Sequence, residues 1–321
     1  MISGDEHMAR IARIKTDEVA TSYHICQRTA GDKGAYPLMQ EANKRRLIDL
    51  MRHYSRPFFC EISGFSVMGN HFHLVIKMEK NEERSRAELM KRAKVLYPNS
   101  DDILENWDDD QWEHFRKRLF NLSEYMSNVK AAFTKWHNKK HDRLGSFWNE
   151  RFKSAILLGN NAILECLLYI DLNPLRAGIQ EIPELYKAGS LFLRHLGKDD
   201  WLMPLKQILP SLQQPDDESY LEYYRAKVYY RGSVATKKNQ AILSKALLEK
   251  EVERGFKVPG MYLQKCHYFI GGLAIGSERK IKRLVKKLQN KGHTIRDAIP
   301  ILHANGNHQS LKRCRDGPVT T

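Results

Sequence analysis

The sequence of 321 residues has no long apolar run and few cysteines, and both shortages narrow the classes of protein that it can represent. No stretch approaches the roughly 18 apolar residues that a membrane-spanning helix needs. The first residues, MISGDEHMARIARIK, lack the apolar centre of a secretory signal peptide. The five cysteines are scattered and form no CxxC pair, which argues against a disulfide framework and against a cysteine zinc site. We therefore expect a reduced, cytoplasmic protein with no membrane partner.

Acidic residues are outnumbered as well. The chain has 53 Lys and Arg against 38 Asp and Glu, which gives a net charge of +15 and a pI of about 9.5. Nucleic acid is the commonest partner of such a protein, although a lysine-rich surface without any acidic partner would give the same balance. From Thr236 to the end there are 18 basic residues against 6 acidic ones, whereas Ser100–Glu113 is strongly acidic. This asymmetry predicts a basic C-terminal part that faces nucleic acid and a separate acidic insertion.

The apolar pattern predicts an α+β fold with an antiparallel sheet. Thr21–Thr29, the two halves of Phe58–Met78 and the end of Gly145–Leu158 read as strands, with helical periodicity between them. After Gly178 the pattern becomes helical and basic. We predict a first domain over residues 1–196, with a helical, acidic insertion at about 81–121. Residues 197–321 are then a basic, mostly helical accessory region that binds DNA.

The stretch GNHFHLVI, Gly69–Ile76, places two histidines at the start of an alternating run. Residues two apart in a strand point to the same face, so His71 and His73 should project together. Two neighbouring imidazoles are half of a site for a divalent metal ion. A pair of surface histidines on an edge strand would show the same spacing, and the pattern does not separate the two interpretations.

A further set of polar residues lies on the predicted helix Asn161–Asn173. Glu165, Tyr169 and Asn173 are four residues apart and share one helical face. Tyr169 could act as a nucleophile on a phosphate polarised by a metal ion, with Asn173 one turn away as a ligand. Equally, Tyr169 could pack in the core and Asn173-Pro174 could simply end the helix.

Three blocks of the sequence resemble the HUH superfamily of single-tyrosine, single-strand DNA transposases, and in particular its REP-associated tyrosine transposase branch. They are YHICQRT (Tyr23–Thr29), FSVMGNHFHLVI (Phe65–Ile76) and GSFWNERFKSAI with LLYIDLNPLRAGI (within Gly145–Ile179). Together they span about half of the chain. His73 and Tyr169 are 96 residues apart, which is long for compact members, and we expect the insertion between them to shield or regulate the site.

The resemblance implies a ferredoxin-like antiparallel sheet with helices on one face. It implies that His71, His73 and Asn173 bind Mg²⁺ or Mn²⁺ and that Tyr169 is the nucleophile. The implied reaction is the cleavage and rejoining of single-stranded or hairpin DNA through a 5′-phosphotyrosine. Such a protein would be associated with the nucleoid. Both a homodimer and a monomer fit the resemblance.

Two basic segments are the predicted DNA contacts. In one, cations are interleaved with Trp136, Trp148 and Phe152, and we expect Trp148 and Phe152 to be core residues. The other is an amphipathic helix over Ser277–Gly292, whose basic face could equally be only solvated. The predicted contacts are Lys135, Lys139, Lys140, Arg143, Arg151, Lys153, Arg279, Lys280, Lys282, Arg283, Lys286 and Lys287.

A second hypothesis is a domesticated relative that binds DNA hairpins or regulates transcription without cutting. The complete set of His71, His73 and Tyr169 favours the enzyme, because a protein that only binds DNA has no need of it.

Overall fold

The fold is described from a computed structural model, which describes residues 18–31, 34, 36–209, 217–235, 240–253, 272–292, 299–301 and 308–312. Within these ranges, no helix has the length and apolar character that crossing a membrane requires.

Four antiparallel strands form the centre of the protein, in the order β2-β3-β1-β4. Helix α1 follows β1, and α5, the last of the helices between β3 and β4, packs with it on one face, as the two helices of a ferredoxin-like fold do. The predicted α+β, ferredoxin-like class is therefore confirmed. The elements are β1 (Thr21–Arg28), α1 (Glu41–Ser55), β2 (Cys60–Val67), β3 (His71–Met78), α5 (Leu122–His141) and β4 (Lys153–Leu158).

The C-terminal part adds strands to this sheet as well as the helices that were expected. Strand β5 (Gly272–Ser277) pairs in parallel with β4, and β7 (His308–Lys312) and β6 (Ile299–Ile301) continue the sheet to seven strands. The helices are α9 (Asp217–Gly232), α10 (Lys245–Glu253) and α12 (Glu278–Gln289). The sequence did not indicate the strands, because GLAIGS is short and lacks strict alternation.

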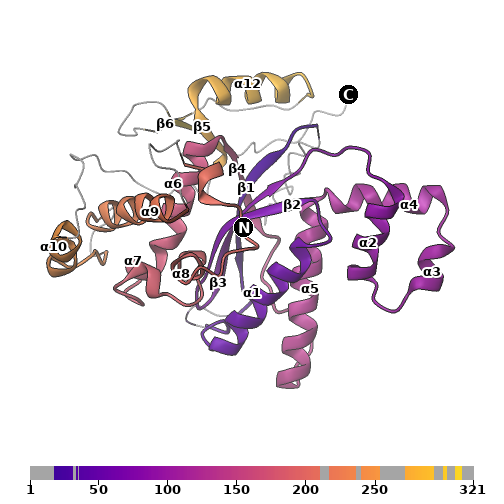
Figure 1. Cartoon of the computed structure of the whole chain (residues 1–321), viewed down its shortest axis with the longest axis horizontal. Coiled ribbons are helices and arrows are strands. Elements are labelled where there is room, and N and C mark those ends of the chain that lie inside the picture. Colours follow the sequence, from indigo (N-terminus) through magenta and orange to yellow (C-terminus); the bar gives the residue numbers. More distant parts are fainter. Residues whose placement is uncertain are drawn as a thin grey trace, which may run out of the picture.

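Helices cover both faces of the sheet, not one face as the resemblance implied (Figure 1). Helices α1, α5 and α12 share a core with Phe72, Leu74 and Ile76. On the other face, α6 (Asn160–Asp171), α8 (Ser190–His195) and α9 pack over Val75 and Leu157. The reason is visible in β3, where the consecutive residues from Phe72 to Ile76 are all buried, so both of its faces need cover. Short elements complete this layer, namely α7 (Asn173–Arg176), η1 (Pro183–Leu185) and η2 (Leu205–Gln207).

A glycine in β2 lets α6 and α8 approach the sheet closely. A Cβ atom at Gly64 would lie 2.5 Å from Leu167 Cδ2 and 2.8 Å from Ser190 Oγ. The hydroxyl of Ser190 accepts a hydrogen bond of 3.0 Å from the backbone N–H of Phe65. Helix α6 is therefore held against the strands at the distance that this glycine permits.

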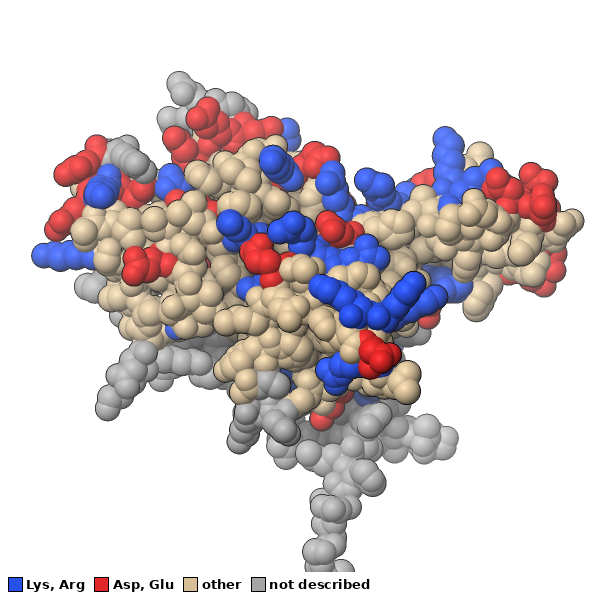
Figure 2. All heavy atoms as spheres, turned by 90° about the horizontal axis from the view of Figure 1, so that it is seen from below, with Lys and Arg blue, Asp and Glu red and all other residues tan. Residues whose placement is uncertain are grey.

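The segment between β3 and α5, residues 79–121, forms a helical arm that projects to one side (Figure 1). Its helices are α2 (Arg86–Leu96), α3 (Asp101–Glu105) and α4 (Asp109–Leu119). The side chains of Tyr97, Trp107, Trp112 and Phe115 give the arm an aromatic core of its own. Acidic side chains gather at its far end, and basic ones gather near its junction with the rest of the protein (Figure 2).

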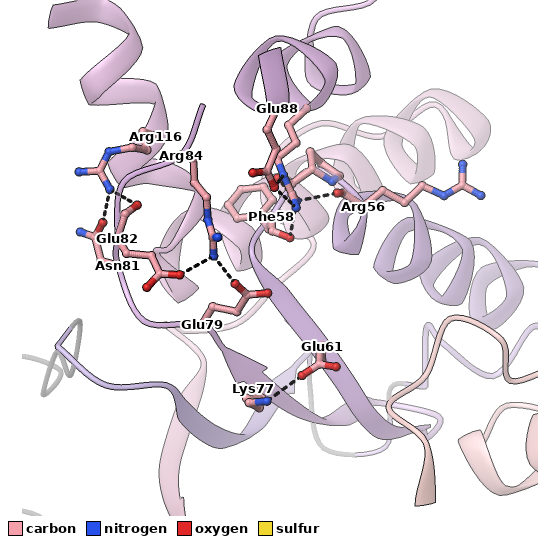
Figure 3. A network of polar contacts seen from close by, with 12 residues as sticks. Arg56, Phe58, Glu61, Lys77, Glu79, Asn81, Glu82, Arg84, Glu88 and Arg116 are labelled. Carbon is pink, nitrogen blue, oxygen red and sulfur yellow. Dashed lines mark hydrogen bonds and ion pairs between the residues drawn. The ribbon is translucent and has the colours of Figure 1, made fainter. Parts of the chain in front are cut away.

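Arginine side chains fix the base of the arm to the sheet and α1 (Figure 3). One guanidinium nitrogen of Arg92 donates to the carbonyl oxygens of residues 56, 57 and 58, at 3.0 to 3.2 Å. Arg116, which is only 5% exposed, donates to Asn81 and to the backbone of Glu82. Arg92 therefore ties the arm to the segment between α1 and β2, and Arg116 closes the base of the arm on itself.

The arm leaves β3 after Met78, at the opposite end of the strand from His71. The seven residue-to-residue steps from His71 to Met78 span roughly 23 Å along the strand. The expectation that the insertion shields the histidines is therefore not supported by where it is attached. Helix α5 then runs back for about 30 Å, towards the histidine end of the sheet.

Candidate active site

Strand β3 places His71 and His73 together on the sheet face that α6 covers. Their ring centroids are 5.0 Å apart. In the neighbouring strands, His73 lies opposite Cys26 and Ser66, and His71 lies opposite Arg28. His73 is 1% exposed, whereas His71 at the strand end is half-buried. One histidine is therefore built into the structure and the other borders solvent.

Tyr169 reaches the same place from α6. Its ring centroid lies 5.5 Å from that of His73, and the two rings meet edge to face. The side chain is half-buried, so part of it borders solvent. The structure thus brings together three predicted site residues whose segments are far apart in sequence.

Sequence reasoning missed His24, a third histidine of this cluster. It lies on β1, is 1% exposed, and its Nε2 is 2.9 Å from Nδ1 of His73. Its ring stacks on His73 at 5.1 Å and meets Tyr169 edge to face at 6.1 Å. The sequence signal that could have identified His24 is a polar residue between the apolar Tyr23 and Ile25 of an alternating strand. This alternation places His24 on the opposite face of the strand from Tyr23 and Ile25, which is the face of the histidine cluster.

Burial keeps both β3 histidines neutral near pH 7. It lowers the pKa of His71 to about 4, with a smaller contribution from the charge of Arg28. Burial also lowers the pKa of His73 well below its usual value, helped by His24, His71 and Arg28. A neutral imidazole keeps a lone pair on one nitrogen, which is the form that binds metal ions.

The donor set fits a divalent ion in part. Nδ1 of His71 lies 2.7 Å from Oδ1 of Asn70, so the ring donates there and keeps its lone pair on Nε2. Nδ2 of Asn173 is buried without a hydrogen-bond partner, an orphaned polar group close in sequence to Tyr169. No hydrogen bond joins Asn173 to either β3 histidine in the described part of the chain. Nor do His, Cys, Asp and Glu side chains form any group of three or more that could hold a metal among the residues described.

Glu165, from the same predicted helical face, has a different role. Its carboxylate pairs with Arg231 of α9 at 2.6 Å. This ion pair ties α6 to α9, and Glu165 is therefore a structural residue.

A buried carboxylate on α6 also went unnoticed in the sequence. Asp171 accepts a hydrogen bond of 2.6 Å from the hydroxyl of Tyr224 on α9, and burial raises the pKa of Asp171 to about 7. Tyr224 and its neighbours Tyr220 and Tyr229 are buried core residues. These contacts hold the helix that carries Tyr169.

Cations surround the histidine end of the sheet. Arg28, which sequence reasoning missed, is exposed opposite His71, and Lys153 is exposed on β4 opposite Cys26. The segment after α5 joins the same end, because Thr29 pairs with Trp148 and the N–H of Asn149 donates to the carbonyl of Arg28. Arg143 and Arg151 are exposed on this segment, and Lys135, Lys139 and Lys140 are exposed on α5, which covers the opposite face of the sheet from α6.

The aromatic residues of this segment are core residues. Trp148 and Phe152 are 6% and 8% exposed. The expectation that Trp148 and Phe152 pack in the core agrees with the structure.

The six cations predicted on α12 lie elsewhere. Ile281, Leu284 and Leu288 anchor this helix in the core of the α1 and α5 face, opposite to α6. Only Lys280 approaches the α6 side, where it contacts Gly159 at the start of that helix. Lys282 and Lys287 are paired with Glu278 and Glu18. Arg279, Arg283 and Lys286 are exposed on this second face.

No family model matches the chain, and no curated protein matches it. A search of solved structures finds a REP-associated tyrosine transposase bound to a REP hairpin. It shares 12% identity, covers 65% of this chain and 95% of its own, and superimposes with a TM-score of 0.41. That neighbour belongs to the family that the sequence motifs resemble. A superposition this loose does not transfer residue roles, so the case for function depends on the side chains of this protein.

Proposed function

We propose that this protein is a metal-dependent endonuclease and strand transferase that acts on single-stranded or hairpin DNA. The observation that carries the proposal is the meeting of Tyr169 with a pair of neutral histidines, at a ring distance of 5.5 Å from His73. The cluster lies at the end of the sheet where exposed cations gather. A nucleophile, two nitrogen donors and a basic surface are the parts that phosphodiester transfer needs.

In the proposed reaction, the phenolic oxygen of Tyr169 attacks a backbone phosphorus. A bond forms between that oxygen and phosphorus, and the bond from phosphorus to the 3′ oxygen breaks. The phenol loses its proton, and the departing oxygen takes up a proton to become a 3′-hydroxyl. The 5′ side of the break stays on Tyr169 as a phosphotyrosine. Attack by a 3′-hydroxyl reverses these steps and releases the tyrosine, so joining needs no ATP.

His71, His73 and Asn173 are the residues proposed to hold Mg²⁺ or Mn²⁺. When bound, such an ion would neutralise the charge that develops on the phosphate. Arg28 and Lys153 border the same face and would attract the DNA backbone to it. Burial supports this arrangement, because it keeps the two imidazoles uncharged as ligands must be.

Exposed apolar side chains at this end support a partner with unpaired bases. Tyr36 and Met39 are 54% and 57% exposed and lie against Gly69, two residues before His71. Leu144, in the basic segment after α5, is 97% exposed. Aromatic and apolar groups among cations suit single strands, whose bases can stack on them while phosphates meet the cations.

The test is the formation of a covalent adduct. Wild type and Tyr169→Phe would be incubated with labelled hairpin oligonucleotides and Mn²⁺ or Mg²⁺, and then separated on a denaturing gel. We expect an adduct with wild type, none with Tyr169→Phe, and none after EDTA. Tyr223→Phe, on a half-buried tyrosine of α9, is the matched control and should behave as wild type. Hairpin binding without an adduct under any condition would instead favour a DNA-binding or regulatory protein.

A further inference from the structure

His24 is a buried polar side chain for which the proposed reaction has no direct use. It is 1% exposed on the central strand β1, below α6. Its Nε2 lies 2.9 Å from Nδ1 of His73, and the two rings are within 17° of parallel. A histidine in such a place costs stability unless its ring nitrogens are hydrogen-bonded, so this contact is a built feature.

Only one proton can lie between these two nitrogens. Which of the two nitrogens is bonded to it decides whether Nε2 of His73 can bind a metal ion. If Nδ1 of His73 carries the proton, its Nε2 keeps a lone pair. If Nε2 of His24 carries it, His73 holds its own proton on Nε2 and cannot bind a metal ion there. The chemistry of the site therefore depends on the tautomer that His24 adopts.

The neighbouring histidine shows which arrangement is consistent. Nδ1 of His71 faces the side-chain oxygen of Asn70 at 2.7 Å, and an amide oxygen can only accept. His71 therefore presents its lone pair on Nε2. The two histidines can act as a pair of ligands only if His73 does the same, which requires His24 to be the acceptor.

We propose that His24 is a positioning residue, which accepts a hydrogen bond from Nδ1 of His73 and holds Nε2 of that ring as a metal ligand. This inference rests on the proposed function. It assigns to His24 the part that a carboxylate or a backbone carbonyl plays behind other metal-binding histidines. The acceptor here is a neutral ring, so the site gains orientation without an added negative charge.

The experiment compares His24→Phe, which keeps a ring but has no acceptor, with His24→Gln, which restores an acceptor near the position of Nε2. Mn²⁺ binding would be measured without DNA, by calorimetry and by electron paramagnetic resonance. We expect His24→Phe to weaken Mn²⁺ binding by about 10- to 100-fold. His24→Gln should recover most of that loss. His137→Phe is the matched control, because His137 is also a buried histidine, 4% exposed, but packs among Phe133 and Phe147 of α5 and its following segment.

The second measurement is the tautomer of His73 in the metal-free protein, read from the ¹⁵N shifts of its ring. We expect the Nδ1–H form in wild type and in His24→Gln, and a mixture in His24→Phe. A dominant Nε2–H form in wild type would overturn the inference, as would equal Mn²⁺ affinity of wild type and a folded His24→Phe. Failure of the proposed function would look different: wild type would bind no Mn²⁺ and form no adduct, while the tautomer would still report on His24.

Discussion

Replacing Gly64 with alanine should loosen the packing that holds α6, the helix of Tyr169, against the sheet. The new methyl group would lie 2.5 Å from Leu167 Cδ2 and 2.8 Å from Ser190 Oγ, both well inside van der Waals contact. Leu167 is 2% exposed and Ser190 is 1% exposed, so neither can swing into solvent. Overpacking of this kind costs about 1–3 kcal/mol.

A second cost comes from the hydroxyl of Ser190. It accepts the 3.0 Å hydrogen bond from the backbone N–H of Phe65, a fully buried residue. If the methyl group displaces the hydroxyl, that N–H loses its partner, which costs about 1–3 kcal/mol more. We therefore expect Gly64→Ala to lower the free energy of unfolding by about 2–6 kcal/mol in total.

Urea unfolding followed by circular dichroism would measure this loss. Gly189→Ala is the matched control, because a Cβ atom there meets nothing closer than 3.4 Å. It should stay within about 1 kcal/mol of wild type. If α6 shifts, Gly64→Ala should also form the DNA adduct more slowly, because α6 carries Tyr169 and leads into Asn173. Equal stability of the two variants would refute the packing argument.

Three further predictions concern the titration of the site, the DNA surface and the arm. The pKa of folded His71, about 4, is below its usual 6.5, so the unfolded chain binds more protons between these pH values. The free energy of unfolding should therefore fall as the pH drops from 6.5 towards 4, by at most about 1.4 kcal/mol per pH unit for this group. Urea unfolding of His71→Asn at several pH values should show a shallower fall than wild type. Tyr36→Ala should weaken hairpin-loop binding by about 1–3 kcal/mol without changing how steeply the affinity falls with salt concentration. Arg143→Ala should reduce the slope of log affinity against log salt by about 1. Fluorescence anisotropy measures both, and the reverse pattern would contradict the stacking role of Tyr36. Arg116→Met removes the hydrogen bonds to Asn81 and Glu82, and should speed hydrogen exchange in α2 and α4 without changing adduct formation, since the arm is attached far from the histidines.

Local pattern was sufficient to predict the strand or helix on which each candidate site residue lies. Alternation in HFHLVI placed His71 and His73 on one face of a strand, and the strand that contains them spans His71–Met78. The four-residue spacing put Tyr169 on a helix that the structure gives as Asn160–Asp171. The apolar stripe of Ser277–Gly292 predicted a helix, and α12 is that helix. Each of these three predictions depends on an apolar repeat of two or 3.6 residues, which can be recognised from residues that are neighbours in the sequence.

Contacts between distant segments were decided only by the tertiary structure. His24 meets His73, 49 residues away in the chain, because β1 and β3 pair in one register. The alternation within either strand does not say how the two strands will align. The apolar stripe of α12 likewise does not say which face of the sheet it will cover, and it packs opposite to α6. Strand β5 became a strand by pairing with β4, more than a hundred residues earlier in the chain. The sequence by itself determined which side chains could do chemistry, and long-range strand pairing decided which of them meet, because that pairing gains its energy from packing that exists only in the folded chain.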